Sequence, residues 1–204
     1  MIMCMYKNMI AVTNRHLVNG DFMAQMEKVV DKSPRAIILR EKDITEKEYD
    51  ELLLKIIFLI MNKKAQDTNH ITLYIHSHIS LVSKYISIYP FLGVHMSLHK
   101  LVTKKKEVVE LKRQYHISIS VSCHTLDEVR MAASFGADQI VLGNIFETDC
   151  KKGLPGKGLD FLAEAVSVTT LPVYGIGGIT LENISGLLAA GAAGGCMMSG
   201  FMRA

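Results

Sequence analysis

The sequence has few cysteines, little net charge and no long apolar run. None of its four cysteines has C-x-x-C spacing, which argues against a zinc site or a disulfide framework and favours reduced thiols in a cytoplasm. A formal net charge of +3 gives little support for nucleic-acid binding. No apolar stretch reaches the ~20 residues of a membrane span, and the start of the chain lacks the pattern of a secretion signal. We therefore expect a cytoplasmic protein without nucleic-acid or membrane partners.

The remaining composition predicts one globular domain over residues 1–204, because 49% of the residues are hydrophobic and 21% are charged. Short apolar runs, typical of buried parallel strands, alternate with helical patterns. This alternation predicts an α/β fold, a single (β/α)₈ TIM barrel. Only four residues follow Gly200, so we expect a short or missing eighth helix. The strands are predicted at residues 9–12, 36–39, 71–75, 91–95, 117–122, 139–142, 172–176 and 194–198.

Helix boundaries are marked by two kinds of signal. Thr45 and Thr125 each have a glutamate three residues later, the pattern of a capping box at a helix start. Gly136 and Gly191 follow helical patterns at the positions where glycine commonly ends a helix.

Two glycine-rich turns close the last two predicted strands. The first glycine turn is residues 175–178 (Gly-Ile-Gly-Gly), and the second is residues 198–200 (Met-Ser-Gly). Backbone N–H groups after a strand, with no Cβ in the way, bind phosphate well, and TIM barrels bind phosphate after strands seven and eight. We therefore predict a small phosphorylated ligand. Its expected contacts here are Gly177, Gly178, Met198, Ser199 and Gly200.

Other polar residues follow predicted strands, where a barrel places its active site. His124 follows strand five and can take and return a proton near neutral pH, although a histidine that only hydrogen-bonds the backbone at a helix start is an equal alternative. Lys151 can close over an anion, although on this residue alone an ordinary solvated lysine is the favoured interpretation. Arg40 and Lys42 can bind an anion jointly, and a surface mixture of Arg40, Glu41 and Lys42 explains these charges equally well. His76 and its neighbours have no accompanying carboxylate, so no metal site is predicted.

Six segments together resemble the family of thiamine phosphate synthase and its relative TenI, the thiazole tautomerase. The resemblance covers most of the chain and is densest over residues 118–200. The loop after strand six has nearly the TenI wording. The segments are residues 39–42 (LREK), 93–95 (GVH), 122–128 (SCHTLDE), 146–153 (FETDCKKG), 172–180 (PVYGIGGIT) and 198–200 (MSG).

The departures from the family pattern favour the TenI branch. The synthase has aspartates after strands three and four that bind magnesium, and the matching residues here are Ser77 and Lys100. Its glutamine before the Arg-x-Lys pair is Ile38. The asparagine that TenI has after strand three is missing as well, and this departure from the TenI pattern leaves the detailed substrate contacts open. The resemblance thus implies an isomerase, a cofactor-free and metal-free thiazole tautomerase of thiamine biosynthesis.

The same resemblance implies the roles of the site residues. His124 is the acid and base that moves the proton, and the glycine turns hold the phosphate of the thiazole substrate. Lys151 and Arg40 hold its carboxylate or close the site. The further implied substrate contacts are Lys42, Ser122 and Thr148.

Two other functions remain open. One is thiamine phosphate synthase, a transferase that joins a thiazole phosphate to a pyrimidine pyrophosphate with magnesium, for which Asp149 is a substitute ligand. The other is a non-catalytic relative that binds a thiamine precursor and acts through a partner protein. A barrel side left bare by a short eighth helix would expose apolar surface, which favours a homodimer.

Overall fold

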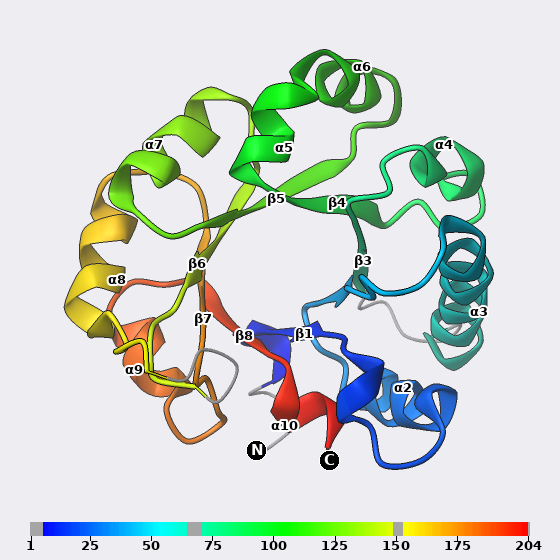
Figure 1. The fold of residues 1–204 in the computed structure, drawn as a ribbon, viewed down its shortest axis with the longest axis horizontal. Helices are drawn as coiled ribbons and strands as arrows, with labels where there is room; N and C mark the ends of the chain where they lie inside the picture. The colour runs from blue at the N-terminus through cyan, green and yellow to red at the C-terminus, as the bar shows by residue number, and fades with distance from the viewer. Residues whose placement is uncertain (1–5, 65–70, 149–152, 204) are drawn as a thin grey trace. The chain divides into compact units, whose positions relative to one another are not determined.

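The computed structural model describes residues 6–64, 71–148 and 153–203, and the strands form a closed barrel in chain order with helices around it (Figure 1). This confirms the predicted (β/α)₈ barrel. The strands are β1 (Met9–Val12), β2 (Ala36–Leu39), β3 (Thr72–His76), β4 (Leu92–Ser97), β5 (Ser118–Cys123), β6 (Gln139–Gly143), β7 (Val173–Ile176) and β8 (Gly194–Met197).

The strand predictions agree with the structure to within two residues at each end. The first two strands match at both ends, and the eighth ends one residue earlier than expected. Every residue of β1, β2, β6 and β8 is buried, as expected for parallel strands covered on both faces. The helices are α2 (Phe22–Asp31), α3 (Glu46–Lys64), α4 (Leu81–Tyr85), α5 (Leu98–Thr103), α6 (Lys105–Tyr115), α7 (Leu126–Ser134), α8 (Gly158–Ser167), α9 (Ile184–Ala189) and α10 (Ser199–Met202), with 3-10 turns η1 (Tyr6–Asn8) and η2 (Arg15–Leu17).

The chain falls into two compact units, Met1–Val94 with Met198–Ala204 and His95–Met197. The predicted single domain over residues 1–204 stays a prediction. In the first unit β1, β2 and β3 are parallel neighbours, with Ala36 level with both Ile10 and Thr72. Helices α2 and α3 lie side by side outside these strands (Figure 1). The parallel pairing brings the residues that follow β1 and β2 to the same edge of the sheet.

In the second unit β5 to β8 are likewise parallel neighbours. Ile140 of β6 is level with Val121 of β5 and Val173 of β7, and Tyr174 is level with Gly194 of β8. Figure 1 shows α7, α8 and α9 following one another along the outside of these strands. The loops after β5, β6 and β7 therefore begin at one edge of the sheet.

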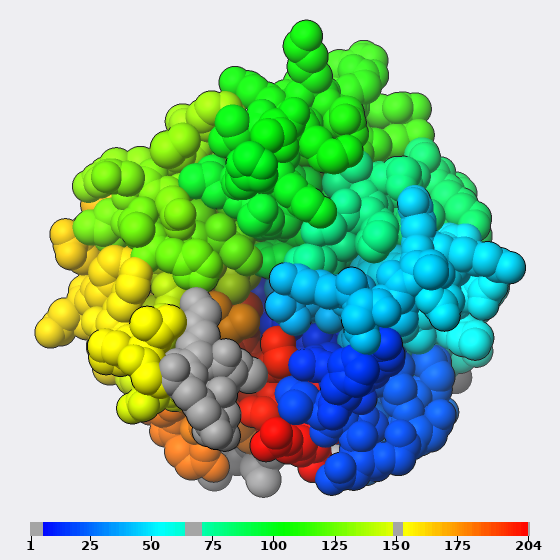
Figure 2. Space-filling model, viewed as in Figure 1, coloured from blue at the N-terminus to red at the C-terminus, as the bar shows by residue number. Residues whose placement is uncertain are grey.

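The last helix is short and is packed into the first unit. Helix α10 has four residues, which confirms the predicted short eighth helix. The Phe201 and Met202 side chains are fully buried, and the Phe201 ring lies 5.5 Å from the ring of Tyr6 in η1. Gln25 Nε2 donates a hydrogen bond to the Phe201 carbonyl at 2.6 Å. Figure 2 shows this C-terminal segment (red) beside the segment that follows β1 (blue). The expected homodimer stays a prediction.

The predicted caps are present with one difference. Thr45 and Glu48 form a complete capping box, in which the Glu48 carboxylate accepts from the Thr45 N–H at 2.8 Å. Thr125 accepts from the Glu128 N–H, but the Glu128 carboxylate accepts from the backbone N–H of His124 instead. Gly136 and Gly191 have φ angles of 89° and 86°, as expected of glycines that end helices. Across the described residues, no helix combines the length and the apolarity that a membrane span requires.

Candidate functional site

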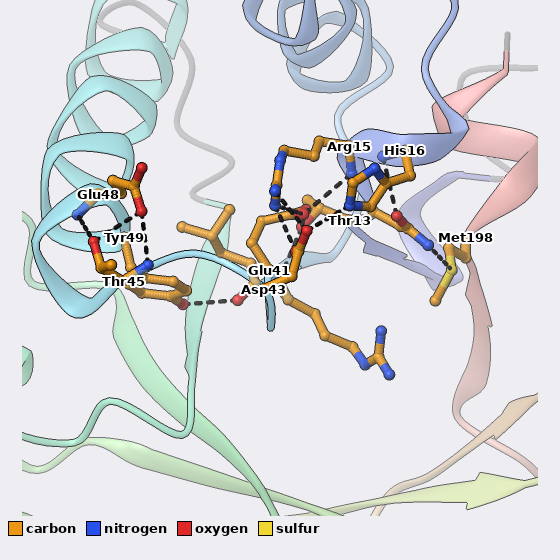
Figure 3. A network of polar contacts seen from close by, with 12 residues as sticks. Thr13, Arg15, His16, Glu41, Asp43, Thr45, Glu48, Tyr49 and Met198 are labelled. Atoms are coloured by element: carbon orange, nitrogen blue, oxygen red, sulfur yellow. Dashed lines mark hydrogen bonds and ion pairs between the residues drawn. The ribbon is translucent and has the colours of Figure 1, made fainter.

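The residue that follows β1 is hydrogen-bonded to the residues that follow β2 (Figure 3). The fully buried hydroxyl of Thr13 accepts a hydrogen bond from the Arg40 backbone N–H at 2.9 Å and donates one to Glu41 Oε1 at 2.7 Å. The Glu41 side chain is only 1% exposed, whereas Arg40 is half-buried and Lys42 is exposed. Arg40 and Lys42, the expected anion-binding pair, therefore flank the buried carboxylate of Glu41. The alternative of a mixture of surface charges is wrong for Glu41, because its side chain is not at the surface.

Arg15 supplies the charge that this buried carboxylate requires. Its backbone N–H and its Nη1 lie 3.2 and 3.4 Å from Glu41 Oε2. Its guanidinium also forms two hydrogen bonds of 2.6 Å to Asp43, and His16 Nε2 lies 2.6 Å from the same carboxylate (Figure 3). Hydrogen bonds from Arg15, and then from His16, lower the pKa of Asp43 to about 2. The backbone around Arg40 and Lys42 is thus held by a connected set of polar contacts.

Tyr49 of α3 joins the carboxyl ends of β2 and β3. Its buried hydroxyl donates to the Leu39 carbonyl at 2.7 Å and accepts from the His76 backbone N–H at 2.9 Å. Its ring also lies 4.3 Å from that of His78. Burial raises the pKa of the Tyr49 phenol, so this hydroxyl keeps its proton. The sequence contained no clear signal for this role.

In the second unit a buried histidine fixes two serines of β5. His95 of β4 is hydrogen-bonded through Nδ1 to Ser120 Oγ and through Nε2 to Ser122 Oγ, both at 2.8 Å. Ser120 also accepts from Gln139 Nε2 at 3.0 Å. Ser122, a predicted substrate contact, is half-buried at the end of this network. Ser120 and Gln139 were not predicted from the sequence, and both are buried polar residues of strands, at 0% and 7% exposure.

The imidazole ring of His124 contacts Gly143, the last residue of β6. Its Nδ1 is 3.3 Å from the Gly143 carbonyl, and a Cβ on Gly143 would come within 3.2 Å of the imidazole ring. Because a carbonyl only accepts hydrogen bonds, this contact requires a proton on Nδ1 and leaves Nε2 of a neutral ring as an acceptor. Its backbone contacts are with the Glu128 carboxylate and with Nζ of Lys157. The geometry thus accommodates both a helix-start role and a chemical role for His124.

The first glycine turn approaches the loop after β6 closely. Gly177 and Gly178 have φ angles of 104° and 63°, in the left-handed region that favours glycine. A Cβ on Gly177 would lie 2.8 Å from Asn144 Cβ, and one on Gly178 would lie 2.6 Å from the Glu147 carbonyl oxygen. Because Asn144 follows Gly143, the first glycine turn and His124 meet at the same end of β6.

The second glycine turn differs from its predicted form. Ser199 and Gly200 form the first turn of α10 and are exposed, rather than making a separate loop after β8. Met198 precedes this helix, and its sulfur accepts a hydrogen bond from Asn14 Nδ2 at 3.8 Å. Thr148 is half-buried at the end of a described range, whereas Lys151 and Asp149 lie outside the described residues.

The structure therefore places the predicted site residues in two sets. Within the described ranges, no three His, Cys, Asp or Glu side chains are grouped so as to hold a metal ion. The first unit holds Arg40, Lys42, Met198, Ser199 and Gly200, and the second holds Ser122, His124, Thr148, Gly177 and Gly178.

Comparison with known proteins identifies the family. The family model of thiamine monophosphate synthase (TMP-TENI) matches residues 9–201. The putative thiamine-phosphate synthase 2 of Aquifex aeolicus is 29% identical over 94% of this chain and 96% of its own length. The thiamine-phosphate synthase of Caldivirga maquilingensis is 37% identical over 55% of this chain, which spans about half (53%) of that relative.

A solved structure agrees with the fold. Thiamine phosphate pyrophosphorylase from Pyrococcus furiosus superposes with a TM-score of 0.73 at 21% identity, covering 96% of this chain and 88% of that one. These names favour the transferase alternative, so the expected isomerase, a thiazole tautomerase, is wrong. Because the family model extends from β1 into α10, the chain belongs to the thiamine monophosphate synthase family.

Proposed function

We propose that this protein is a thiamine-phosphate synthase, a transferase that joins a thiazole phosphate to a pyrimidine pyrophosphate and releases inorganic pyrophosphate. The observation that carries the proposal is the family match over residues 9–201. Relatives with the synthase name that align over nearly the whole chain support it, such as those of Fusobacterium nucleatum and Clostridium acetobutylicum, matched over 94% and 98% of this chain.

Each unit offers groups suited to one of the two phosphorylated substrates. Arg40 and Lys42 supply positive charge for the pyrophosphate, whose negative charge grows as the carbon–oxygen bond breaks. The backbone N–H groups of Gly177 and Gly178 suit the phosphate of the thiazole. In this proposal Ser122, held by His95, contacts the substrate next to His124.

The residues present do not fit the magnesium ion that the family resemblance implies. The positions of the two expected aspartates hold Ser77 and Lys100, and an ammonium group repels a divalent cation. No three metal-ligating side chains come together elsewhere among the residues that the structure describes. We therefore propose that Arg40 and Lys42, rather than magnesium, compensate the negative charge of the leaving group.

The test is a direct assay with the two proposed substrates. Purified protein is incubated with the thiazole phosphate and the pyrimidine pyrophosphate, in EDTA or in magnesium, and thiamine phosphate and pyrophosphate are quantified. We expect equal amounts of the two products and a similar rate in both conditions. Product formation only with magnesium would refute the proposed charge compensation, and no product in either condition would refute the synthase function.

A matched pair of variants assigns the charge to its residue. Lys42→Gln removes a proposed pyrophosphate contact, whereas Lys47→Gln removes an exposed lysine of α3. We expect turnover to fall at least about tenfold in the first variant, as for loss of a charge-assisted contact, and to be unchanged in the second. Equal activity of the two variants would exclude Lys42 from the site.

A further inference from the structure

The hydroxyl of Thr13, the residue after β1, is hydrogen-bonded to both Arg40 and Glu41, the two residues that follow β2. It has one proton, and the Glu41 carboxylate at 2.7 Å can only accept a hydrogen bond. Thr13 must therefore donate to Glu41 and present a lone pair to the Arg40 backbone N–H, which lies 2.9 Å away. The buried carboxylate thus sets the direction of the hydrogen bond that holds Arg40.

The Glu41 carboxylate is itself held firmly. Its side chain is 1% exposed, and both of its oxygens have donors, Thr13 on Oε1 and Arg15 on Oε2. A carboxylate in such a place is stable only while these donors remain, because burying an uncompensated charge is costly. Asp43 accepts two hydrogen bonds of 2.6 Å from the Arg15 guanidinium, one from Nη1, which also contacts Glu41, and one from Nη2. Glu41 and Asp43, the residues directly before and after Lys42 in the sequence, are therefore both bound to Arg15.

We propose that Thr13 and Glu41 are positioning residues for the proposed reaction: they hold the backbone of Arg40 and Lys42 so that these two cations bind the pyrophosphate group. Both are buried, whereas Arg40 is half-buried and Lys42 is exposed, so they act through the cationic pair rather than on the substrate. A site that must stabilise a leaving group needs donors fixed before the reaction, since a small misplacement lowers the rate strongly. The inference rests on the proposed function for the identity of the anion.

The experiment compares Thr13→Val, Thr13→Ser and a control. Valine keeps the shape of threonine but loses both hydrogen bonds, whereas serine keeps the hydroxyl. The control is Tyr89→Phe, which removes a buried hydroxyl bonded to the Ile71 carbonyl, before the amino end of β3. Affinity for inorganic pyrophosphate is measured by calorimetry, and KM for each substrate is measured by the product assay.

We expect Thr13→Val to weaken pyrophosphate binding about tenfold and to raise KM for the pyrimidine pyrophosphate alone. Thr13→Ser should restore both values, and Tyr89→Phe should change neither. If Thr13→Val does not fold, the double variant Thr13→Val/Glu41→Met, which removes both partners of the buried hydrogen bond, is measured instead.

The binding measurement separates this inference from the proposed function. A wild-type protein that binds pyrophosphate but forms no thiamine phosphate refutes the synthase function, while the valine and serine variants still test the positioning role. The inference would be overturned if Thr13→Val or its double variant binds pyrophosphate with wild-type affinity, or if Tyr89→Phe loses as much affinity as Thr13→Val. It would also be overturned if Thr13→Ser fails to restore binding, or if the wild type does not bind pyrophosphate.

Discussion

Replacing Gly178 with alanine tests the close approach between the first glycine turn and the loop after β6. The new Cβ would lie 2.6 Å from the Glu147 carbonyl oxygen and 2.8 Å from Phe146 Cβ, whereas ordinary contact begins near 3.4 Å. The obstructing oxygen belongs to the backbone, so the loop itself must move. Gly136→Ala is the matched control, because Gly136 also has a positive φ but a Cβ there would have no heavy atom within 4 Å.

The expected magnitudes differ between the two variants. The left-handed backbone alone costs an alanine about 1–2 kcal/mol, which applies to both. Forced contact adds about 1–3 kcal/mol at Gly178 only. For a chain of this size 1 kcal/mol corresponds to roughly 2–4 °C in Tm. We therefore expect Gly178→Ala to lower Tm about twice as much as Gly136→Ala.

Urea unfolding and phosphate binding, measured on the same samples, complete this test. Gly178→Ala should also weaken binding of inorganic phosphate, since it displaces backbone N–H groups proposed to bind the thiazole phosphate. Gly136→Ala should bind phosphate like the wild type. Equal losses of stability would show that the close approach imposes no constraint, and unchanged phosphate affinity in Gly178→Ala would remove the first glycine turn from the site.

Three further predictions concern single groups. NMR titration should give Asp43 a pKa of about 2, and Arg15→Met should raise this pKa towards the ordinary ~3.9. The contacts of Asp43 therefore stabilise the folded protein above pH ~4, and this contribution is lost as the pH falls towards 2. An ordinary pKa of Asp43 in the wild type would contradict the prediction. Burial raises the pKa of Cys123 to about 12 and also raises that of Cys196. Iodoacetamide at pH 8 should therefore label neither of these two thiols until the protein is unfolded. Labelling of Cys123 or Cys196 in the native state would disprove their burial. Tyr49→Phe removes the hydroxyl that bridges the Leu39 carbonyl and the His76 backbone N–H, and it should lower the free energy of unfolding by about 2 kcal/mol in urea titrations. A loss near zero would mean that other groups replace the hydroxyl.

The strands were predictable because their physics is local. Parallel strands buried on both faces need continuous apolar residues, and runs such as residues 9–12 and 36–39 have few other interpretations. The capping box at Thr45 was also readable, since its partners are three residues apart. At Thr125 the same spacing gave only half of the box, because the Glu128 carboxylate reaches the backbone N–H of His124 instead.

The site was predictable only in part, because its contacts join residues far apart in the chain. Arg40 was found from its place after a strand, but nothing nearby indicates that Glu41 is buried against Thr13, 28 residues away. A polar residue directly after the apolar run of β1 was the available signal for Thr13. The isomerase prediction relied on the wording of residues 146–153 and on the two missing aspartates, and the synthase names of relatives aligned over nearly the whole chain contradict it.

The tyrosine that joins β2 to β3 has a consequence for how this barrel can evolve. One phenol oxygen serves the residue before Arg40 and the residue before Ser77, so a substitution at Tyr49 disturbs two loops at once. Changes in either loop that shift its strand end must also remain compatible with that shared atom. Mutations in the two loops are therefore expected to show epistasis. A library that randomises both loops together should contain active pairs of loop sequences in which each loop sequence alone is inactive.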